Sequence, residues 1–170
     1  MPHKSGFVNI VGNPNVGKST LMNVLTGMKL SIITSKVQTT RHRITGIVNG
    51  EDFQIIYSDT PGLIRPAYKM QEQMVKYAYS ALADADIILF VTDIFESPDT
   101  SQDIIKKLNR LKVPVLILIN KTDLDSSGSV SRLTSAWSVI MPDAEIMPVS
   151  ALKGFNLEKL VDRIIEHQKE

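Results

Sequence analysis

Apolar residues along this chain gather in short, nearly continuous runs that alternate with segments predicted to form helices. The runs at residues 7–11, 44–48, 53–58, 86–92, 113–119 and 145–149 are predicted to be β-strands. Helices are predicted to begin near residue 17 and to cover about 71–83, 98–111, 130–140 and 156–168. Apolar strands that alternate with helices build a mostly parallel sheet that is covered on both faces.

One pair of predicted strands departs from this alternation. The dipeptide Asn49-Gly50 joins the run at 44–48 to the run at 53–58, and Asn-Gly is the strongest short signal for a β-hairpin. The prediction is therefore an α/β fold with a six-stranded, mostly parallel sheet, one antiparallel strand, and helices on both faces. A long connection over 27–43 shows no sustained period, and such connections inside compact domains are usually functional.

Composition narrows the class of protein. A length of 170 residues predicts a single domain, and no apolar run approaches the roughly 20 residues that cross a bilayer. The chain has no cysteine and no apolar signal core at its N-terminus, which fits a reducing compartment, so we expect a cytoplasmic protein. With 19 Lys and Arg against 18 Asp and Glu, a net charge of +1 gives no overall attraction to nucleic acid or membranes.

The clearest motif lies between the first predicted strand and the first predicted helix. Residues 12–19 read Gly-Asn-Pro-Asn-Val-Gly-Lys-Ser, which is the phosphate-binding pattern G-x-x-x-x-G-K-S in its strand–loop–helix context. Backbone N–H groups and the positive end of the helix dipole favour phosphate oxygens there. Lys18 can reach the β- and γ-phosphates, and the Ser19 hydroxyl can ligate Mg²⁺. The motif predicts a nucleoside triphosphate site.

Three more polar segments, 59–62, 120–123 and 150–151, each directly follow a predicted strand. Ligands of parallel sheets bind at the carboxyl ends of the strands, so these loops should converge on the phosphate loop. In P-loop enzymes a carboxylate at the position of Asp59 holds Mg²⁺, and the Gly62 N–H can bond the γ-phosphate. The alternative for Asp-x-Pro-Gly is an ordinary Asx-type turn.

Asn120-Lys121-Thr122-Asp123 is the candidate base-reading segment. The Asp123 carboxylate can accept hydrogen bonds from N1–H and the exocyclic amine of guanine, whereas adenine offers neither donor. Asn120 can meet N7, the Lys121 stem can cover the face of the base, and the Ala151 N–H can donate to O6. Alone, this segment would also suit a polar cap after a strand.

With these motifs, the chain resembles the G domain of the Era family of ribosome-assembly GTPases, in the TrmE-Era-like class, over essentially its whole length. The motifs that carry the resemblance are residues 12–19, Gln-Thr-Thr-Arg-His-Arg at 38–43, Asp-Thr-Pro-Gly-Leu at 59–63, 120–123 and Ser150-Ala151. The resemblance implies a P-loop GTPase fold, GTP and GDP with Mg²⁺ as ligands, slow hydrolysis, and switch segments at about 28–43 and 59–70.

The family also implies partners: small-subunit ribosomal RNA and the ribosome, bound through a C-terminal KH domain, and it allows peripheral membrane contact. We expect these 170 residues to be a G domain without a KH domain. Either they are part of a longer protein or the chain is without the RNA-binding module of the family, and in the second case direct binding to RNA is not expected.

The resemblance further assigns the switch residue that contacts Mg²⁺ and the γ-phosphate to Thr40, with Thr39 as the competing assignment. Relatives with an apolar residue at the position of Leu63 and an Asn at that of Asn15 can use K⁺, so Asn15 is expected to coordinate K⁺; the rival interpretation is that it only shapes the loop. The absence of a water-positioning glutamine keeps a second function open, a nucleotide-binding scaffold with negligible hydrolysis. A P-loop ATPase or small-molecule kinase is disfavoured by residues 120–123.

The predicted site residues form three sets. The catalytic set is Asn15, Lys18, Thr40 and Gly62, and the metal-binding set is Ser19, Thr40 and Asp59. The nucleotide-binding set is Gly12, Asn13, Pro14, Asn15, Val16, Gly17, Lys18, Ser19, Thr20, Asp59, Thr60, Pro61, Gly62, Asn120, Lys121, Asp123, Ser150, Ala151 and Leu152.

Overall fold

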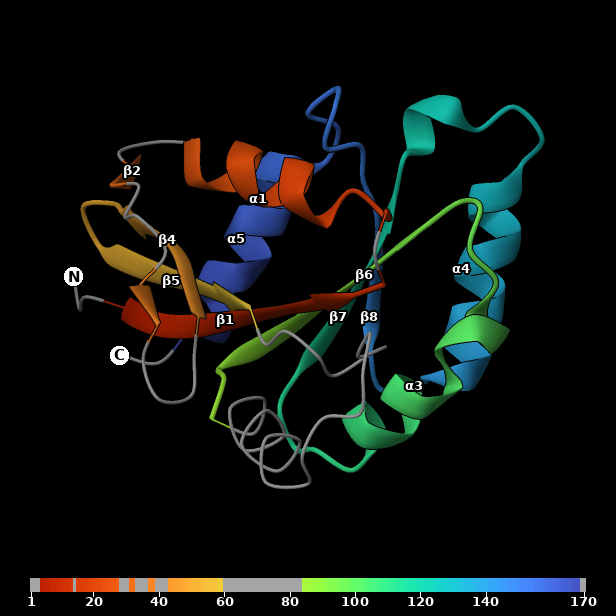
Figure 1. The fold of residues 1–170 in the computed structure, drawn as a ribbon, viewed down its shortest axis with the longest axis horizontal. Coiled ribbons are helices and arrows are strands. Elements are labelled where there is room, and N and C mark those ends of the chain that lie inside the picture. Colours follow the sequence, from red (N-terminus) through yellow and green to blue (C-terminus); the bar gives the residue numbers. More distant parts are fainter. Residues whose placement is uncertain are drawn as a thin grey trace.

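A twisted sheet forms the centre of the computed structural model, which describes residues 4–13, 15–27, 31–32, 37–38, 43–59 and 84–168 (Figure 1). Its six longer strands are β1 (Lys4–Gly12), β4 (Arg43–Asn49), β5 (Phe53–Asp59), β6 (Ile87–Asp93), β7 (Val115–Asn120) and β8 (Glu145–Pro148). They lie in the order β4-β5-β1-β6-β7-β8. All neighbours are parallel except β4 and β5. The predicted six-stranded sheet with one antiparallel strand is confirmed.

Two short strands add to one edge of this sheet. β2 (Ser31–Ile32) and β3 (Val37–Gln38) both pair antiparallel with β4. The interpretation of 27–43 as a connection without regular structure was therefore incomplete. An edge strand such as β4 offers unpaired backbone groups, and two-residue pairings of this kind leave no periodic pattern in a sequence. The predicted helix at 71–83 lies outside the described residues.

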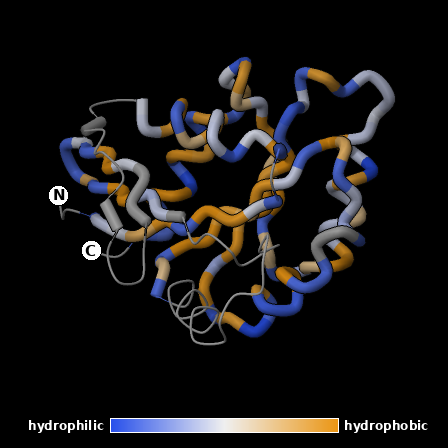
Figure 2. Tube along the Cα trace, viewed as in Figure 1, coloured by the Kyte–Doolittle hydropathy of each residue, from blue (hydrophilic) through white to orange (hydrophobic). Residues whose placement is uncertain are grey.

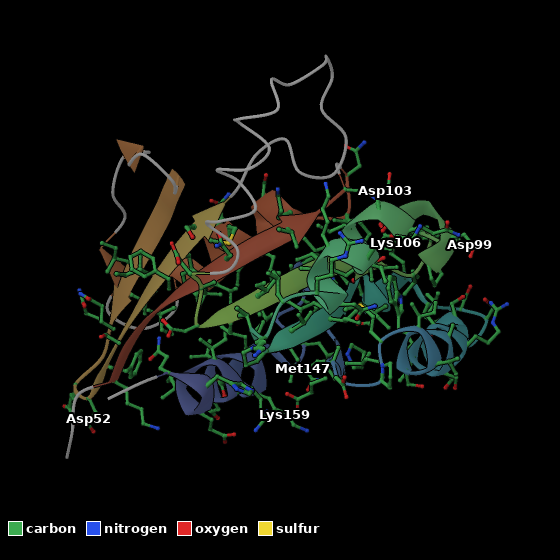
Figure 3. The ribbon with its side chains drawn as sticks, turned by 90° about the horizontal axis from the view of Figure 1, so that it is seen from below. Asp52, Asp99, Asp103, Lys106, Met147 and Lys159 are labelled. Carbon is green, nitrogen blue, oxygen red and sulfur yellow. The ribbon has the colours of Figure 1, made fainter. Side chains whose placement is uncertain are left out.

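The hairpin between β4 and β5 turns later than predicted. Asn49 pairs with Gln54 in the sheet, and the Gly50 N–H donates to the Phe53 carbonyl at 2.8 Å, so the tip is at residues 51–52. The Gln54 side-chain amide also donates to Asn49 Oδ1 at 2.8 Å, which keeps Asn49 in the strand. Figure 3 shows Asp52 of this tip at the opposite end of the molecule from Asp99. The antiparallel pair was predicted correctly, but its turn residues were not.

Helices cover both faces of the sheet, as predicted. In the part of the chain that the structure describes, the helical elements are α1 (Lys18–Gly27), the 3₁₀ turn η1 (Pro98–Ser101), α3 (Gln102–Asn109), the 3₁₀ turn η2 (Thr122–Leu124), α4 (Ser129–Ile140) and α5 (Leu157–His167). α1 and α5 lie over one face, and α3 and α4 lie over the other (Figure 1). Over the described ranges, no helix has both the length and the apolar character that crossing a membrane requires.

The apolar side chains form two core clusters, one on each face of the sheet. Along β6, Leu89 and Val91 belong to the cluster under α1 and α5, while Ile88 and Phe90 belong to the other. In the second cluster the rings of Phe90 and Trp137 meet edge to face, with centroids 5.4 Å apart. Figure 2 shows the central strands as predominantly hydrophobic. A strand buried on both faces holds the loop that follows it in a fixed position.

Candidate functional site

The parallel strands bring four loops to one rim of the sheet. Gly12 at the end of β1 pairs with Val91 of β6, and Asp93 at the end of β6 pairs with Asn120 at the end of β7. β8 runs parallel to β7 and ends at Pro148, two residues before Ser150. The predicted convergence is therefore present in the register of the sheet for the loops after β1, β7 and β8, while residues 60–62 of the predicted loop at 59–62 lie outside the described residues.

The backbone of the phosphate loop needs glycine at two points. A Cβ on Gly12 would lie 2.6 Å from the carbonyl oxygen of Val91, so the loop leaves β1 in close contact with β6. Gly17 has φ +89°, and a Cβ there would collide with the side-chain amide of Asn120. Asn15 also has a positive φ, 71°. Left-handed residues in a loop between a strand and a helix produce the concave row of N–H groups that suits phosphate.

Asn120 ties the base-reading segment to the phosphate loop. The residue is 3% exposed, and its Nδ2 donates to the Val16 carbonyl at 2.9 Å. Its Oδ1 accepts from the Ala151 N–H at 3.0 Å. One buried amide therefore joins the loops that follow β1, β7 and β8. The predicted contacts of Asn120 with N7 and of Ala151 with O6 stay predictions.

Lys121 makes a second connection between the same loops. It adopts the left-handed region, with φ 65°, at the end of β7. Its Nζ donates to the Asn15 carbonyl at 2.7 Å and lies 3.1 Å from Oδ2 of the buried Asp93. These two contacts direct the Lys121 stem across the rim, where it could cover a base.

Asp123 presents an exposed carboxylate that is oriented from one side. Ser150 is buried, and its Oγ donates to Asp123 Oδ1 at 2.7 Å. The same Oγ accepts from the Lys153 N–H at 3.1 Å, which fixes the direction in which the hydroxyl donates. Asp123 and Ser150 both line a cavity of about 420 Å³. The second oxygen of Asp123 could accept hydrogen bonds from a ligand.

A neighbouring carboxylate, Asp125, fixes the chain where it leaves the base-reading segment. Its Oδ1 accepts from the Ser129 N–H at 3.0 Å and from the Ser127 N–H at 3.3 Å, and its Oδ2 accepts from the Val130 N–H at 3.3 Å. These backbone donors, Ser129 first, lower the pKa of the Asp125 carboxyl. Asp125 thus caps α4 from upstream in its ionised form.

The other predicted residues fall into three groups. Lys18 is the first residue of α1, Ser19 and Thr20 follow it as exposed residues at the mouth of the phosphate loop, and Leu152 is exposed beside Ala151. Asp59 is the last residue of β5 and pairs with Ile10 of β1. The remaining members lie outside the described residues: Pro14, Thr39, Thr40, Thr60, Pro61 and Gly62.

Sequence reasoning missed two residues at this rim, Asp93 and Glu96. The Glu96 carboxylate accepts from Thr92 Oγ1 and from Asn13 Nδ2, both at 2.9 Å. Asp93 Oδ1 accepts from the N–H groups of Phe95 and Glu96, both at 2.9 Å. Their position in the sequence could have indicated them, because both follow the predicted strand at 86–92 and the end of that strand lies at the same rim.

Together, a phosphate loop that requires glycine and a polar loop that is hydrogen-bonded to it define a P-loop nucleotide-binding domain. Residues 7–121 match the family described as 50S ribosome-binding GTPase, and the chain belongs to that family. The chain is 42% identical to the GTPase Era of Clostridium acetobutylicum, over 98% of its own length and 57% of that protein's. It therefore spans just over half the length of the curated relatives that it matches.

Two solved structures of Era proteins are similar to this chain in both sequence and fold. A point variant of Aquifex aeolicus Era bound to GDP·AlF₄⁻ has 40% sequence identity and a TM-score of 0.75, covering 98% of this chain and 58% of that chain. An Era structure in complex with MgGDPNP and nucleotides 1506–1542 of 16S ribosomal RNA has 40% identity and a TM-score of 0.76, covering 99% of this chain and 58% of that one.

Proposed function

We propose that this chain binds GTP and hydrolyses it to GDP and phosphate, acting as a molecular switch. The observation that carries the proposal is the link between Asn120 and Val16, which fixes a base-reading segment against a phosphate loop at 2.9 Å. A phosphate loop alone does not select a base. The exposed Asp123 carboxylate supplies that selection, because guanine presents two donors to it and adenine presents none. A site that needs these hydrogen bonds can reject an analogue by as much as about 10⁴- to 10⁵-fold.

The phosphate end would be held by residues at the start of α1. Lys18 would contact the β- and γ-phosphates, and Ser19 and Asp59 have the oxygen donors that Mg²⁺ prefers. When bound, Mg²⁺ would offset negative charge on the phosphates. Thr40 and Gly62 complete the proposed site, and their loops would be ordered by the γ-phosphate and released after hydrolysis.

Two roles are proposed for Asn15, coordination of K⁺ and shaping of the loop, and substitutions of this residue can distinguish them. Its φ of 71° and its carbonyl bond to Lys121 give a reason for Asn here without any cation, since Asn tolerates the left-handed region better than most residues. Its side chain is exposed, which suits K⁺ coordination. Asn15→Ala would strain the loop, whereas Asn15→Gly removes the side chain and retains the backbone freedom.

We further propose that the chain is the G domain of a protein that acts in small ribosomal subunit assembly. The family description names the 50S subunit, but the 40%-identical Era structure contains 16S ribosomal RNA, which belongs to the small subunit. That structure favours the small subunit. Contact with ribosomal RNA or with a membrane surface and a cytoplasmic location stay predictions.

The deciding experiment is steady-state GTP hydrolysis by the purified chain with Mg²⁺, in KCl and in NaCl at equal ionic strength, with ATP as competitor. We expect slow turnover that excess ATP does not inhibit. Faster turnover in KCl that disappears in Asn15→Gly would support the K⁺ role, and equal rates would support the loop-shaping role. GTP binding without turnover in either salt would favour the scaffold function, and inhibition by ATP would contradict guanine selection.

A further inference from the structure

The turn after β6, residues 93–97, is bonded to both loops that would hold the nucleotide. This β6 turn contacts the phosphate loop through Glu96 and the base-reading segment through Asp93. It leads into η1 and α3, so it is anchored to the sheet on one side and to a helix on the other.

Glu96 connects two strand ends through its carboxylate. Oε1 accepts from Thr92 Oγ1 and Oε2 accepts from Asn13 Nδ2, both at 2.9 Å. Thr92 is fully buried and Asn13 is 7% exposed. Hydrogen bonds to a carboxylate are stronger than neutral ones, and a buried donor that loses its acceptor is costly. Removing this carboxylate should therefore take away one of the bonds that position Asn13, the second residue of the phosphate loop.

Asp93 sets the direction in which Glu96 points. Its Oδ1 accepts from the N–H groups of Phe95 and Glu96, which closes the β6 turn, while its Oδ2 contacts Lys121 Nζ at 3.1 Å. Asp93 is 5% exposed, whereas the Lys121 side chain that it contacts is 31% exposed. One buried carboxylate thus orders both the residue that holds Asn13 and the lysine that crosses the rim.

Because Glu96 is negatively charged, removal of its carboxylate can change nucleotide binding in two ways: through the lost charge and through the lost contact with Asn13. A carboxylate bonded to a phosphate loop repels a bound nucleotide, so its removal by charge alone would strengthen binding. If the carboxylate acts through Asn13, its removal weakens binding instead. The two effects have opposite signs.

We propose that Glu96 is a positioning residue of the nucleotide site: through Asn13 it holds the start of the phosphate loop in the geometry that retains the nucleotide. The proposal rests on the proposed function, because it presupposes guanine nucleotide binding. Loss of Glu96 then speeds nucleotide dissociation, and the effect requires Asn13.

The test is the dissociation rate of N-methylanthraniloyl-GDP, chased with excess GDP. We expect Glu96→Ala to raise the rate about ten-fold, the scale of a lost hydrogen bond to a charged acceptor. Glu96→Gln should raise it less, because its amide can accept from Asn13 and donate to the Thr92 hydroxyl. Asp99→Asn is the charge-matched control. Asp99 is exposed on η1 (Figure 3), and its variant should stay within about two-fold of the unaltered chain.

A double-mutant cycle with Asn13→Ala separates positioning from general destabilisation. We expect the Glu96→Ala, Asn13→Ala pair to release nucleotide no faster than the faster single variant, and the thermal midpoint of nucleotide-free Glu96→Gln to match the unaltered chain. The proposal would be overturned if the rate increases of the two single variants multiplied in the double variant. A dissociation rate that is unchanged or slower in Glu96→Ala would also overturn it. If Glu96→Ala does not fold, an unaltered or slower rate in Glu96→Gln overturns it. Failure of the unaltered chain to bind the labelled GDP would contradict the proposed function instead.

Discussion

The side-chain amide of Asn120 donates to the backbone carbonyl of Val16 at 2.9 Å, across a separation of 104 residues. The amide also lies directly over Gly17, where any Cβ would collide with it. The base-reading segment is therefore packed directly against the phosphate loop. Each of the expectations below depends on this packing or on the side chains that support it.

Asn120→Ala should weaken the fold as well as nucleotide binding. The substitution leaves the Val16 carbonyl and the Ala151 N–H without their buried partner, which costs about 1–3 kcal/mol. Urea unfolding of the nucleotide-free chain measures this loss. The control is Asn109→Ala, an exposed Asn at the end of α3, which should change stability by no more than about 0.5 kcal/mol. Equal stability of the two variants would contradict the structural role of Asn120.

Gly17→Ala should abolish detectable GDP binding, because it combines a positive φ with a collision against Asn120. Gly27→Ala is the matched control, since that glycine ends α1 with open space around its Cβ position. We expect the control to bind GDP normally and to be neutral or more stable by about 0.4–1 kcal/mol. Isothermal titration with GDP compares the two, and normal binding by Gly17→Ala would show that the loop tolerates the displaced amide.

Ser150→Ala should weaken GDP binding about ten-fold, because the Asp123 carboxylate loses the hydroxyl that orients it. The preference for GDP over IDP, which lacks the exocyclic amine, should shrink in parallel. Ser138→Ala, which removes an exposed hydroxyl that bonds only within α4, provides the control. An unchanged GDP-to-IDP ratio in Ser150→Ala would mean that Asp123 is oriented by other contacts.

Asp125 should make the stability of the fold depend on pH. Its pKa is lowered in the folded state by the Ser129 N–H and its neighbours, so its contribution is complete above the ordinary Asp pKa and is lost as pH falls through the lowered value. At pH 7 we expect Asp125→Ala to lower the thermal midpoint by about 2–4 °C. The difference should vanish in strong acid. Asp143→Ala, which removes an exposed carboxylate outside α4, is the control for the loss of one acidic side chain.

Local pattern predicted the fold because the central strands β6 and β7 carry long runs of buried apolar residues. β6 is buried at every residue, and its residues 87–91 are continuously apolar, so the strand was easily recognised. The predictions from sequence were wrong or incomplete where strand pairing depends on the neighbouring strands. β2 and β3 exist because β4 offers an open edge, and the hairpin turn moved to 51–52 because Gln54 bonds Asn49 across the strands.

The sequence by itself determined the elements, the class of site and the motif residues, since these depend on short-range chemistry: glycines in a loop, an amide and a carboxylate after a strand. Only the tertiary structure decided how the motifs are joined. The Asn13–Glu96, Asn15–Lys121 and Asp123–Ser150 contacts link residues that are 83, 106 and 27 positions apart. Such contacts depend on which side chains meet across neighbouring strand ends, and the pattern within each separate segment does not specify that.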